Sequence, residues 1–292
     1  MDNAQIGIIG GSGLYDLDLL EDVHRHCLET PFGSPSGDYL LGRYEGRQVA
    51  FLARHGDGHC LLPSEINYPA NIFGFRMLGV DTILSVSAVG SLKNEIAPGH
   101  LVLPDQFLDQ TRRRRSTFFG EGIAVHVAFA NPVCARLRNR FLVAAREEGA
   151  VTHDGGAYLC IEGPQFSSRA ESFLYRQWGA TVIGMTNIPE AKLAREAEIC
   201  YSTLALVTDY DTWHEEEESV TAGSVIEVLN RNVAMARRVL FRTISGLPPS
   251  AQTADCPCRH ALKNTILTHP SRIPATARKR LALLLDKYLE KQ

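Results

Sequence analysis

The sequence predicts a layered α/β domain in which helices pack against a central sheet. Two observations support this: short apolar stretches typical of strands alternate with amphipathic helical stretches, and the polar, glycine-containing loops follow the strands. Ligand sites in open α/β sheets gather at strand ends, so these loops form the candidate site. No linker or internal repeat divides the 292-residue chain. We therefore expect one domain over residues 1–247 and a helical C-terminal extension over residues 248–292, packed on the same domain.

The first 110 residues contain most of the expected strands and one helix. Strands are expected over residues 5–11, 39–44, 47–56, 80–91 and 100–107. A helix is expected from Pro69, because proline suits the first turn of a helix. The apolar face of this helix would carry Ala70, Phe73 and Met77, and Gly79 would end it.

The remainder of the chain also alternates between strands and helices. Strands are expected over residues 157–166, 181–186 and 199–209, and a short helix should follow Pro189. Three more helices have start signals, at Asn131 with Pro132, at Ser168 with Glu171 in capping-box spacing, and at Thr221. Gly179 would end the second of these. Apolar residues at helical spacing support two of them and the C-terminal tail: Leu137, Phe141 and Ala145; Ile226, Leu229, Val233, Ala236 and Leu240; Leu281, Leu285 and Tyr288.

The composition is that of an ordinary globular protein and offers no bulk attraction to nucleic acid or membrane. Hydrophobic residues make up 45% of the chain and the formal net charge is −3. No apolar run approaches the ~20 residues that span a bilayer. The opening residues lack a charged leader and a cleavage site, so we expect a cytoplasmic protein. The basic run Arg112–Arg115 is expected to lie in a solvated loop.

The seven cysteines divide into two groups. Five lie mostly in apolar strand-like or helical stretches and are expected to be small buried side chains: Cys27, Cys60, Cys134, Cys160 and Cys200. Cys256 and Cys258 form a Cys-Pro-Cys pair in a polar segment, where they could be a redox pair, a disulfide or an inert surface pair. Two cysteines with no nearby second pair make a poor zinc site, so no metal is expected.

Four loops at successive strand ends carry groups that suit an anion. Backbone amides of small residues, hydroxyls and an arginine are the partners that phosphate prefers. In chain order the candidates are Ser12 in "GGSGLYD", Arg54 and His55 in "ARHG", Ser87 in "SAVGS" and Thr186 in "GMTNIPEA". Each loop alone could be an ordinary turn, and a lone histidine is more often structural. Their coincidence favours an anion site.

Two further loops could hold a flat, polar ligand. Phe166 lies in a Gly-Pro loop, where it could stack on a ring or simply anchor the loop. Asp209 and Asp211, in "TDYDTW", point to the same side if the segment is extended. A metal would need more oxygen ligands nearby. Glu215–Glu218 could supply them, but such a run is more typical of a solvated helix start.

Together these segments resemble the trimeric purine nucleoside phosphorylases. The matching stretches are "IGIIGGSGLYD", "TPFGSPS", "ARHG", "PSEINYPANI", "GSL", "IEGPQFSSRAES", "GMTNIPEA" and "TDYDTW", in family order from Ile6 to about Leu240. The resemblance implies a three-layer α/β/α phosphorylase fold with a central mixed sheet. It also implies an enzyme that uses inorganic phosphate as co-substrate, needs no cofactor, and works as a homotrimer or hexamer with shared active sites.

The family pattern also implies roles for individual residues. Phosphate would bind Ser12, Arg54, His55, Thr186 and the Ser87–Ala88 backbone. The base would stack near Phe166, and the ribose would lie over Met185. His126 matches a position that a neighbouring subunit supplies to the 5′ end of the substrate, and Ser167 stands where members acting on 6-oxopurines carry Glu. In some members the Cys-X-Cys pair can form a disulfide.

The aspartate pair narrows the expected substrate. A protonated carboxyl can donate to N7 of a purine, and an ionised one can accept from a 6-amino group. A carbonyl at position 6 would leave a buried carboxylate without a donor, which gives strong discrimination. We therefore expect Asp209 and Asp211 to be catalytic and to select a 6-aminopurine nucleoside. Together with the family resemblance, this implies phosphorolysis of 5′-methylthioadenosine. The alternatives are phosphorolysis of methylthioinosine or another purine nucleoside, and a non-enzymatic nucleoside-binding regulator.

Overall fold

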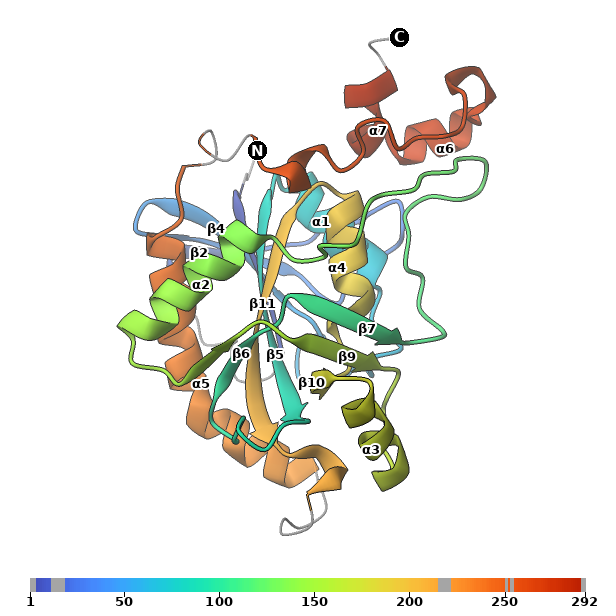
Figure 1. Cartoon of the computed structure of the whole chain (residues 1–292). Helices are drawn as coiled ribbons and strands as arrows, with labels where there is room; N and C mark the ends of the chain where they lie inside the picture. Colours follow the sequence, from blue (N-terminus) through green and yellow to red (C-terminus); the bar gives the residue numbers. More distant parts are fainter. Residues whose placement is uncertain (1–3, 12–18, 215–221, 250–251, 253–254, 290–292) are drawn as a thin grey trace.

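The structure confirms the predicted α/β class. It is a computed structural model that describes residues 4–11, 19–214, 222–249, 252 and 255–289. A mixed sheet of eleven strands forms the central layer, and helices cover both of its faces (Figure 1). The strands are β1 (Ile6–Gly10), β2 (Glu21–His26), β3 (Tyr39–Tyr44), β4 (Arg47–Ala53), β5 (Thr82–Ser91), β6 (Leu101–Leu103), β7 (Gln106–Gln110), β8 (Thr152–Asp154), β9 (Ala157–Ile161), β10 (Ala180–Gly184) and β11 (Cys200–Asp209).

The strand order brings the predicted site loops to one edge of the sheet. Along the sheet the order is β2-β3-β4-β1-β5-β10-β9-β7, and β11 branches from β5 to pair with β6, which pairs with β8. Strands β4, β1, β5 and β11 run parallel to one another, so their carboxyl ends meet at the same edge. β10 is antiparallel to β5, so the chain that leaves β10 runs back along β5.

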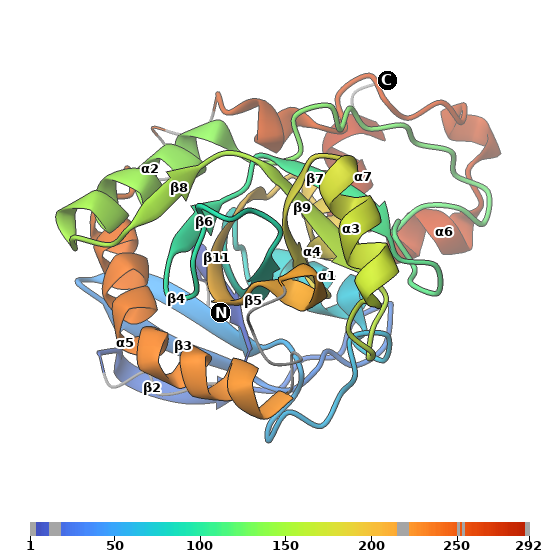
Figure 2. The ribbon, with the colours of Figure 1, turned by 60° about the horizontal axis from the view of Figure 1, so that its bottom comes forward.

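Seven α-helices are described, and they divide between the two faces of the sheet. They are α1 (Tyr68–Met77), α2 (Ala135–Glu147), α3 (Arg169–Gln177), α4 (Asn187–Glu196), α5 (Ala222–Ser245), α6 (Ala275–Arg280) and α7 (Ala282–Leu289). α2 and α5 pack together on one face, while α1 and α4 pack on the other (Figure 2). Among the described helices, none is both long and apolar enough to cross a bilayer.

Local sequence signals placed most helix ends correctly. Ser168 and Glu171 form the predicted capping box at the start of α3, and Gly179 follows its end with φ +79°. α2 begins at Ala135 rather than at Asn131, because Cys134 has an extended backbone and its amide donates to the Tyr201 carbonyl (2.9 Å) of β11. The predicted cap Thr221 lies outside the described residues.

The C-terminal extension packs onto the face that carries α1 and α4. Its buried leucines, Leu262, Leu281, Leu284 and Leu285 among them, share one apolar cluster with Ile72 of α1 and Ala191 of α4. A backbone bridge pairs Ile266 with Val125, and the His126 amide donates to the Thr265 carbonyl (3.1 Å). The extension therefore holds the 123–127 segment, which carries one of the predicted site residues.

The cysteines differ from the sequence prediction at two points. Cys27 and Cys60 are exposed rather than buried, because Cys27 follows the solvent-facing strand β2 and Cys60 lies in a loop. Cys256 and Cys258 are buried rather than on the surface, and a second pair of cysteines from distant parts of the chain lies beside them. All seven cysteines are free thiols.

Candidate active site

The predicted site residues assemble along strand β5. Arg54, just past the end of β4, donates from Nη1 to the Val86 carbonyl (2.9 Å) and from Nη2 to Ser85 Oγ (2.8 Å). Ser87 comes next on β5. Three residues further on, Gly90 lies beside the carboxylate of Asp209. A Cβ at Gly90 would come 2.8 Å from Asp209 Oδ1, so glycine makes room for the aspartate pair.

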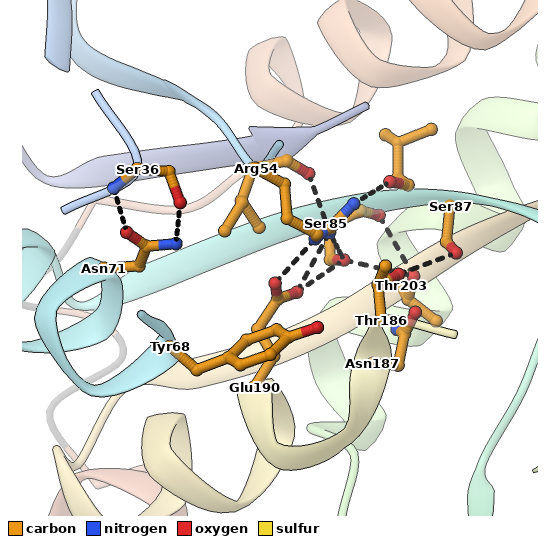
Figure 3. Close-up of polar contacts among 12 residues, drawn as sticks. Ser36, Arg54, Tyr68, Asn71, Ser85, Ser87, Thr186, Asn187, Glu190 and Thr203 are labelled. Atoms are coloured by element: carbon orange, nitrogen blue, oxygen red, sulfur yellow. Dashed lines mark hydrogen bonds and ion pairs between the residues drawn. The ribbon is translucent and has the colours of Figure 1, made fainter. Parts of the chain in front are cut away.

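Arg54 forms a fully buried ion pair with Glu190 of α4. Arg54 Nε donates to Glu190 Oε2 (2.8 Å) and Nη2 donates to Oε1 (3.0 Å), in a bidentate arrangement that Figure 3 shows. Ser85 and Tyr201 also donate to Glu190 Oε1. Both charged side chains are about 1% exposed or less. The carboxylate neutralises most of the guanidinium charge, so Arg54 offers the site an oriented donor rather than a net positive charge.

Glu190 was not predicted as a site residue, although it lies in the same "GMTNIPEA" segment as Thr186. The sequence offered little indication of its role, because a Glu directly after proline is a common, favourable residue in the first turn of a helix. After these contacts Arg54 keeps one Nη1 hydrogen for which the described residues supply no acceptor. That hydrogen is the one Arg54 can still donate to a ligand.

Three hydroxyl groups meet beside Arg54. Ser87 Oγ lies 3.2 Å from Thr186 Oγ1 and 3.1 Å from the Tyr158 hydroxyl. Thr186 is the N-cap of α4, yet its side chain makes no capping bond and turns toward Ser87 instead (Figure 3). All three side chains are buried, and Ala88 follows directly on β5. Hydroxyls at a helix N-terminus are suited to an anion.

His55 is placed next to Arg54 but is electrically neutral. Burial lowers the pKa of His55 to about 4, and its Nδ1 lies 2.9 Å from the Leu61 carbonyl. A carbonyl only accepts, so Nδ1 carries the proton and Nε2 is an acceptor. The His55 ring can therefore accept a hydrogen bond from a protonated phosphate oxygen, but it cannot attract phosphate by charge. Ser12, the other predicted phosphate ligand, lies outside the described residues.

The aspartate pair is adjacent in space, although not through the predicted extended geometry. β11 ends at Asp209, and Asp211 begins a 3₁₀ turn (Asp211–Trp213) with φ +52°. The turn brings the Asp211 amide to Asp209 Oδ1 (2.8 Å), while Thr208 Oγ1 donates to Oδ2 (2.7 Å). Asp211 Oδ2 is buried and finds no hydrogen-bond partner among the described residues. An orphaned buried acceptor of this kind is costly unless a ligand satisfies it.

Both aspartates hold protons more tightly than ordinary carboxyls. Burial raises the pKa of Asp209, against the opposing effect of its hydrogen bond from Thr208. Burial raises the pKa of Asp211 to about 6; the nearby Ser172 hydroxyl opposes this rise, and the charge of Asp209 adds to it. The pair therefore combines a proton reservoir with an unfilled acceptor, the two functions needed to protonate a leaving group and to recognise a donor.

The loop after β9 faces the aspartate turn. Thr212 Oγ1 donates to the Ser167 carbonyl (3.2 Å), which joins the two segments, and Ser167 Oγ is buried without a partner among the described residues. Met185 packs so closely on Gly163 that a Cβ there would come 2.6 Å from its sulfur. Phe166 is 40% exposed, so its ring is available to a ligand.

Arg114 holds the loop after β9 to Met185, contrary to the prediction of a solvated basic run. Its side chain is 1% exposed and pairs with Glu162 (2.7 Å), and its Nη1 donates to the Met185 carbonyl (2.6 Å). The other three arginines of Arg112–Arg115 are exposed, as predicted. The carbonyls that Arg114 bonds come from two distant strand ends, so nothing in the local sequence distinguished it.

His126 lies apart from this constellation. It is exposed, and its backbone is tied to the extension rather than to the strand ends. The structure thus gathers Arg54, His55, Ser87 and Thr186 at one point of the edge, and Asp209, Asp211 and Ser167 at a second. The two groups together can hold an anion beside a flat polar ring.

This fold and this arrangement define a phosphorylase. The chain belongs to the phosphorylase superfamily, whose sequence profile matches residues 5–245. Within it, the chain is 52% identical over 285 residues to S-methyl-5′-thioadenosine phosphorylase of Geobacter sulfurreducens, covering 97% of this chain and 99% of that protein.

Solved structures agree with the sequence relatives. A methylthioadenosine phosphorylase from an antarctic soil metagenomic library superposes with a TM-score of 0.92 at 45% identity, covering 98% of this chain and 100% of that one. The methylthioadenosine phosphorylase of Schistosoma mansoni, in complex with adenine, gives a TM-score of 0.86 at 34% identity, covering 91% and 99%.

Proposed function

We propose that this protein cleaves 5′-methylthioadenosine with inorganic phosphate, releasing adenine and 5-methylthioribose 1-phosphate. The observation that carries the proposal is the buried aspartate pair, in which Asp211 presents an unpartnered carboxylate oxygen. The similarity to methylthioadenosine phosphorylases over nearly the full chain supports it. The reaction is a step of methionine and purine salvage, and we place it in the cytoplasm.

Phosphate binds where the hydroxyls of Ser87 and Thr186 meet the remaining donor of Arg54. The backbone at Ala88 completes the described part of this subsite, and His55 accepts a hydrogen bond from the hydroxyl of monoprotonated phosphate. The family pattern adds Ser12, which lies outside the described residues. As the glycosidic bond stretches, positive charge grows on the sugar C1′. The bound phosphate stabilises this charge and then attacks C1′.

The base leaves with help from the aspartates. Asp209 protonates N7 as general acid, a contribution of roughly two to four orders of magnitude in rate. Asp211, ionised above its pKa of about 6, accepts from the 6-amino group through Oδ2. The base stacks near Phe166 beside Ser167, and the ribose lies over Met185. No cofactor is needed, because phosphate itself is the nucleophile.

One assay tests the reaction class and the base preference together. Adenine release from methylthioadenosine is followed with and without phosphate, and with methylthioinosine as competitor. The proposal expects strict phosphate dependence and weak competition. Equal turnover in phosphate-free buffer would identify a hydrolase, and preferred use of methylthioinosine would make the 6-oxopurine nucleoside the substrate.

We further propose that the active enzyme is a homotrimer or a hexamer in which His126 completes a neighbour's site at the methylthio end. The exposure of His126 supports this, as do the exposed apolar side chains of Phe173 and Leu174 in α3 and of Trp178 at its C-terminal cap. Co-refolding two weakly active variants, Asp209→Asn and His126→Ala, should restore partial activity in mixed oligomers. A fully active monomer in light scattering would contradict the shared site.

A further inference from the structure

Four cysteines from three distant parts of the chain meet at one buried point. Cys134 is the N-cap of α2, Cys200 begins β11, and Cys256 and Cys258 stand at the start of the extension. Their sulfur atoms all lie within 4.8 Å of one another, and each residue is at most 8% exposed. We call this group the four-cysteine cluster. The sequence predicted no metal site, because no second pair of cysteines lies near Cys256 and Cys258 in the chain. The fold supplies that second pair, Cys134 and Cys200.

The spacing of the sulfur atoms fits a metal better than disulfides. The Cys256 sulfur lies 3.5 Å from that of Cys200 and 3.8 Å from that of Cys134. Four sulfurs at about 2.3 Å from a tetrahedral zinc ion lie about 3.8 Å apart. A disulfide needs about 2.05 Å. The four atoms therefore approach the vertices of a zinc thiolate tetrahedron without being bonded in pairs.

The surroundings favour thiolates. Cys134 sits at the N-terminus of the 13-residue helix α2 and its side chain makes no capping bond, so the positive end of the helix dipole faces it. Arg136 Nη2 lies 4.0 Å from the Cys200 sulfur. A surface pocket whose lining includes Arg136, Arg140 and Asp81 also reaches Cys134 and Cys200.

We propose that the four-cysteine cluster is a structural Zn²⁺ site. All four ligands come from the protein, so the coordination sphere is closed and holds no water for catalysis. Each bound sulfur is a thiolate, so metal binding releases the protons that the thiols still carry. β11 separates the cluster from Asp209 by nine residue steps, roughly 30 Å at about 3.3 Å each. The ion therefore takes no part in phosphorolysis.

The site would fasten the extension to the core. Cys134 belongs to α2 and Cys200 to the sheet, whereas Cys256 and Cys258 lie near the start of the extension. Residues 201–255 separate Cys200 from Cys256 in the chain. The same extension holds the 123–127 segment through Thr265. Loss of the ion should therefore loosen the extension first, while the strand-end site keeps its own network of hydrogen bonds.

Metal analysis of the intact protein tests the proposal directly. Protein purified under reducing conditions from zinc-supplemented cells should contain one zinc per chain by mass spectrometry. The double variant Cys256→Ser/Cys258→Ser should lose it. Cys160→Ala, a buried cysteine outside the cluster, and Cys27→Ser, an exposed one, should keep it.

Cobalt supplies a readout that does not depend on variant folding. Wild-type protein freed of metal and loaded with Co²⁺ should show the intense visible and near-ultraviolet absorption of a tetrahedral thiolate complex. Limited proteolysis should cut the extension faster after metal removal. The proposal is overturned if reduced wild-type protein takes up neither zinc nor cobalt. It is also overturned if alkylation of protein unfolded directly from cells, without reductant, finds the four cysteines joined in disulfides.

Discussion

The two ends of strand β11 carry clusters of opposite character. At its carboxyl end, Asp209 and Asp211 form a polar site with an acceptor that no described residue fills. At its amino end, Cys200 joins three other cysteines in a group whose members contact one another. One strand, buried throughout except at Asp209, connects the two. An active site keeps hydrogen-bonding groups unsatisfied until its substrate binds, whereas a structural metal site has all of its ligands supplied by the protein.

The largest effect should come from breaking the buried ion pair at the carboxyl-end site. Arg54→Met leaves Glu190 charged, buried and without its partner, so we expect a loss of about 3–5 kcal/mol in the free energy of unfolding. Urea denaturation measures this. The double variant Arg54→Met/Glu190→Gln should recover much of the loss. As control, Arg43→Met breaks an exposed pair with Asp22 and should cost about 0–1 kcal/mol. A single variant as stable as the parent would show that the pair is not buried as described.

The next effect concerns proton transfer at the same end of β11. Asp209→Asn keeps a hydrogen-bond donor but removes the transferable proton, so kcat should fall at least ~100-fold with a small change in KM for the nucleoside. Asp154→Asn, at a surface strand, is the matched control and should leave kcat unchanged. Near-parental turnover by Asp209→Asn would transfer the general-acid role to another group, Asp211 first.

Selectivity should respond to the second aspartate. The amide of Asp211→Asn can turn to face either an amine or a carbonyl, so the preference for methylthioadenosine over methylthioinosine should fall by roughly tenfold, one charged hydrogen bond's worth. The ratio of kcat/KM for the two nucleosides measures this. If the variant keeps the full parental ratio, the 6-amino group is recognised elsewhere.

The smallest effect is a pH dependence of kcat/KM that arises at the carboxyl-end site of β11 and not at the four-cysteine cluster. Burial raises the pKa of Asp211 to about 6, so Asp211 is ionised above that pH and becomes protonated, losing its acceptor, below it. The kcat/KM for methylthioadenosine should therefore fall about tenfold per pH unit on the acid side of that pKa. Asp211→Asn should remove this limb. An acid limb that persists in the variant would belong to a different group.

Part of this protein could be predicted from local sequence because its causes are local. The Ser168–Glu171 capping box was correct since its bonds span three residues, and the buried strands were correct because β-branched, apolar runs favour a sheet. The motifs at successive strand ends named Arg54, Ser87, Thr186 and the aspartates as one candidate site. The parallel order of β4, β1, β5 and β11 brings most of them to one edge, and the antiparallel strand β10 returns Thr186 to Ser87.

Other features were decided only by the tertiary structure. The extended segment predicted through Asp211 ends at Asp209, because the chain turns at Asp211 with a positive φ. The sequence has no glycine at this position that would have predicted the turn. Arg114 is buried while its neighbours are exposed, since the carbonyls it bonds come from the ends of β9 and β10. Glu190 is a partner of Arg54 from 136 positions away.

The cysteines show most clearly which features the sequence determines and which the tertiary structure decides. The sequence by itself determined their number and the Cys-Pro-Cys spacing. It could not show that Cys134 and Cys200 lie beside Cys256, since these contacts span 122 and 56 residues. Residues so far apart are brought together only by the packing of α2 and the extension around β11. Composition and spacing specify which chemistry is available, and the fold decides which groups meet.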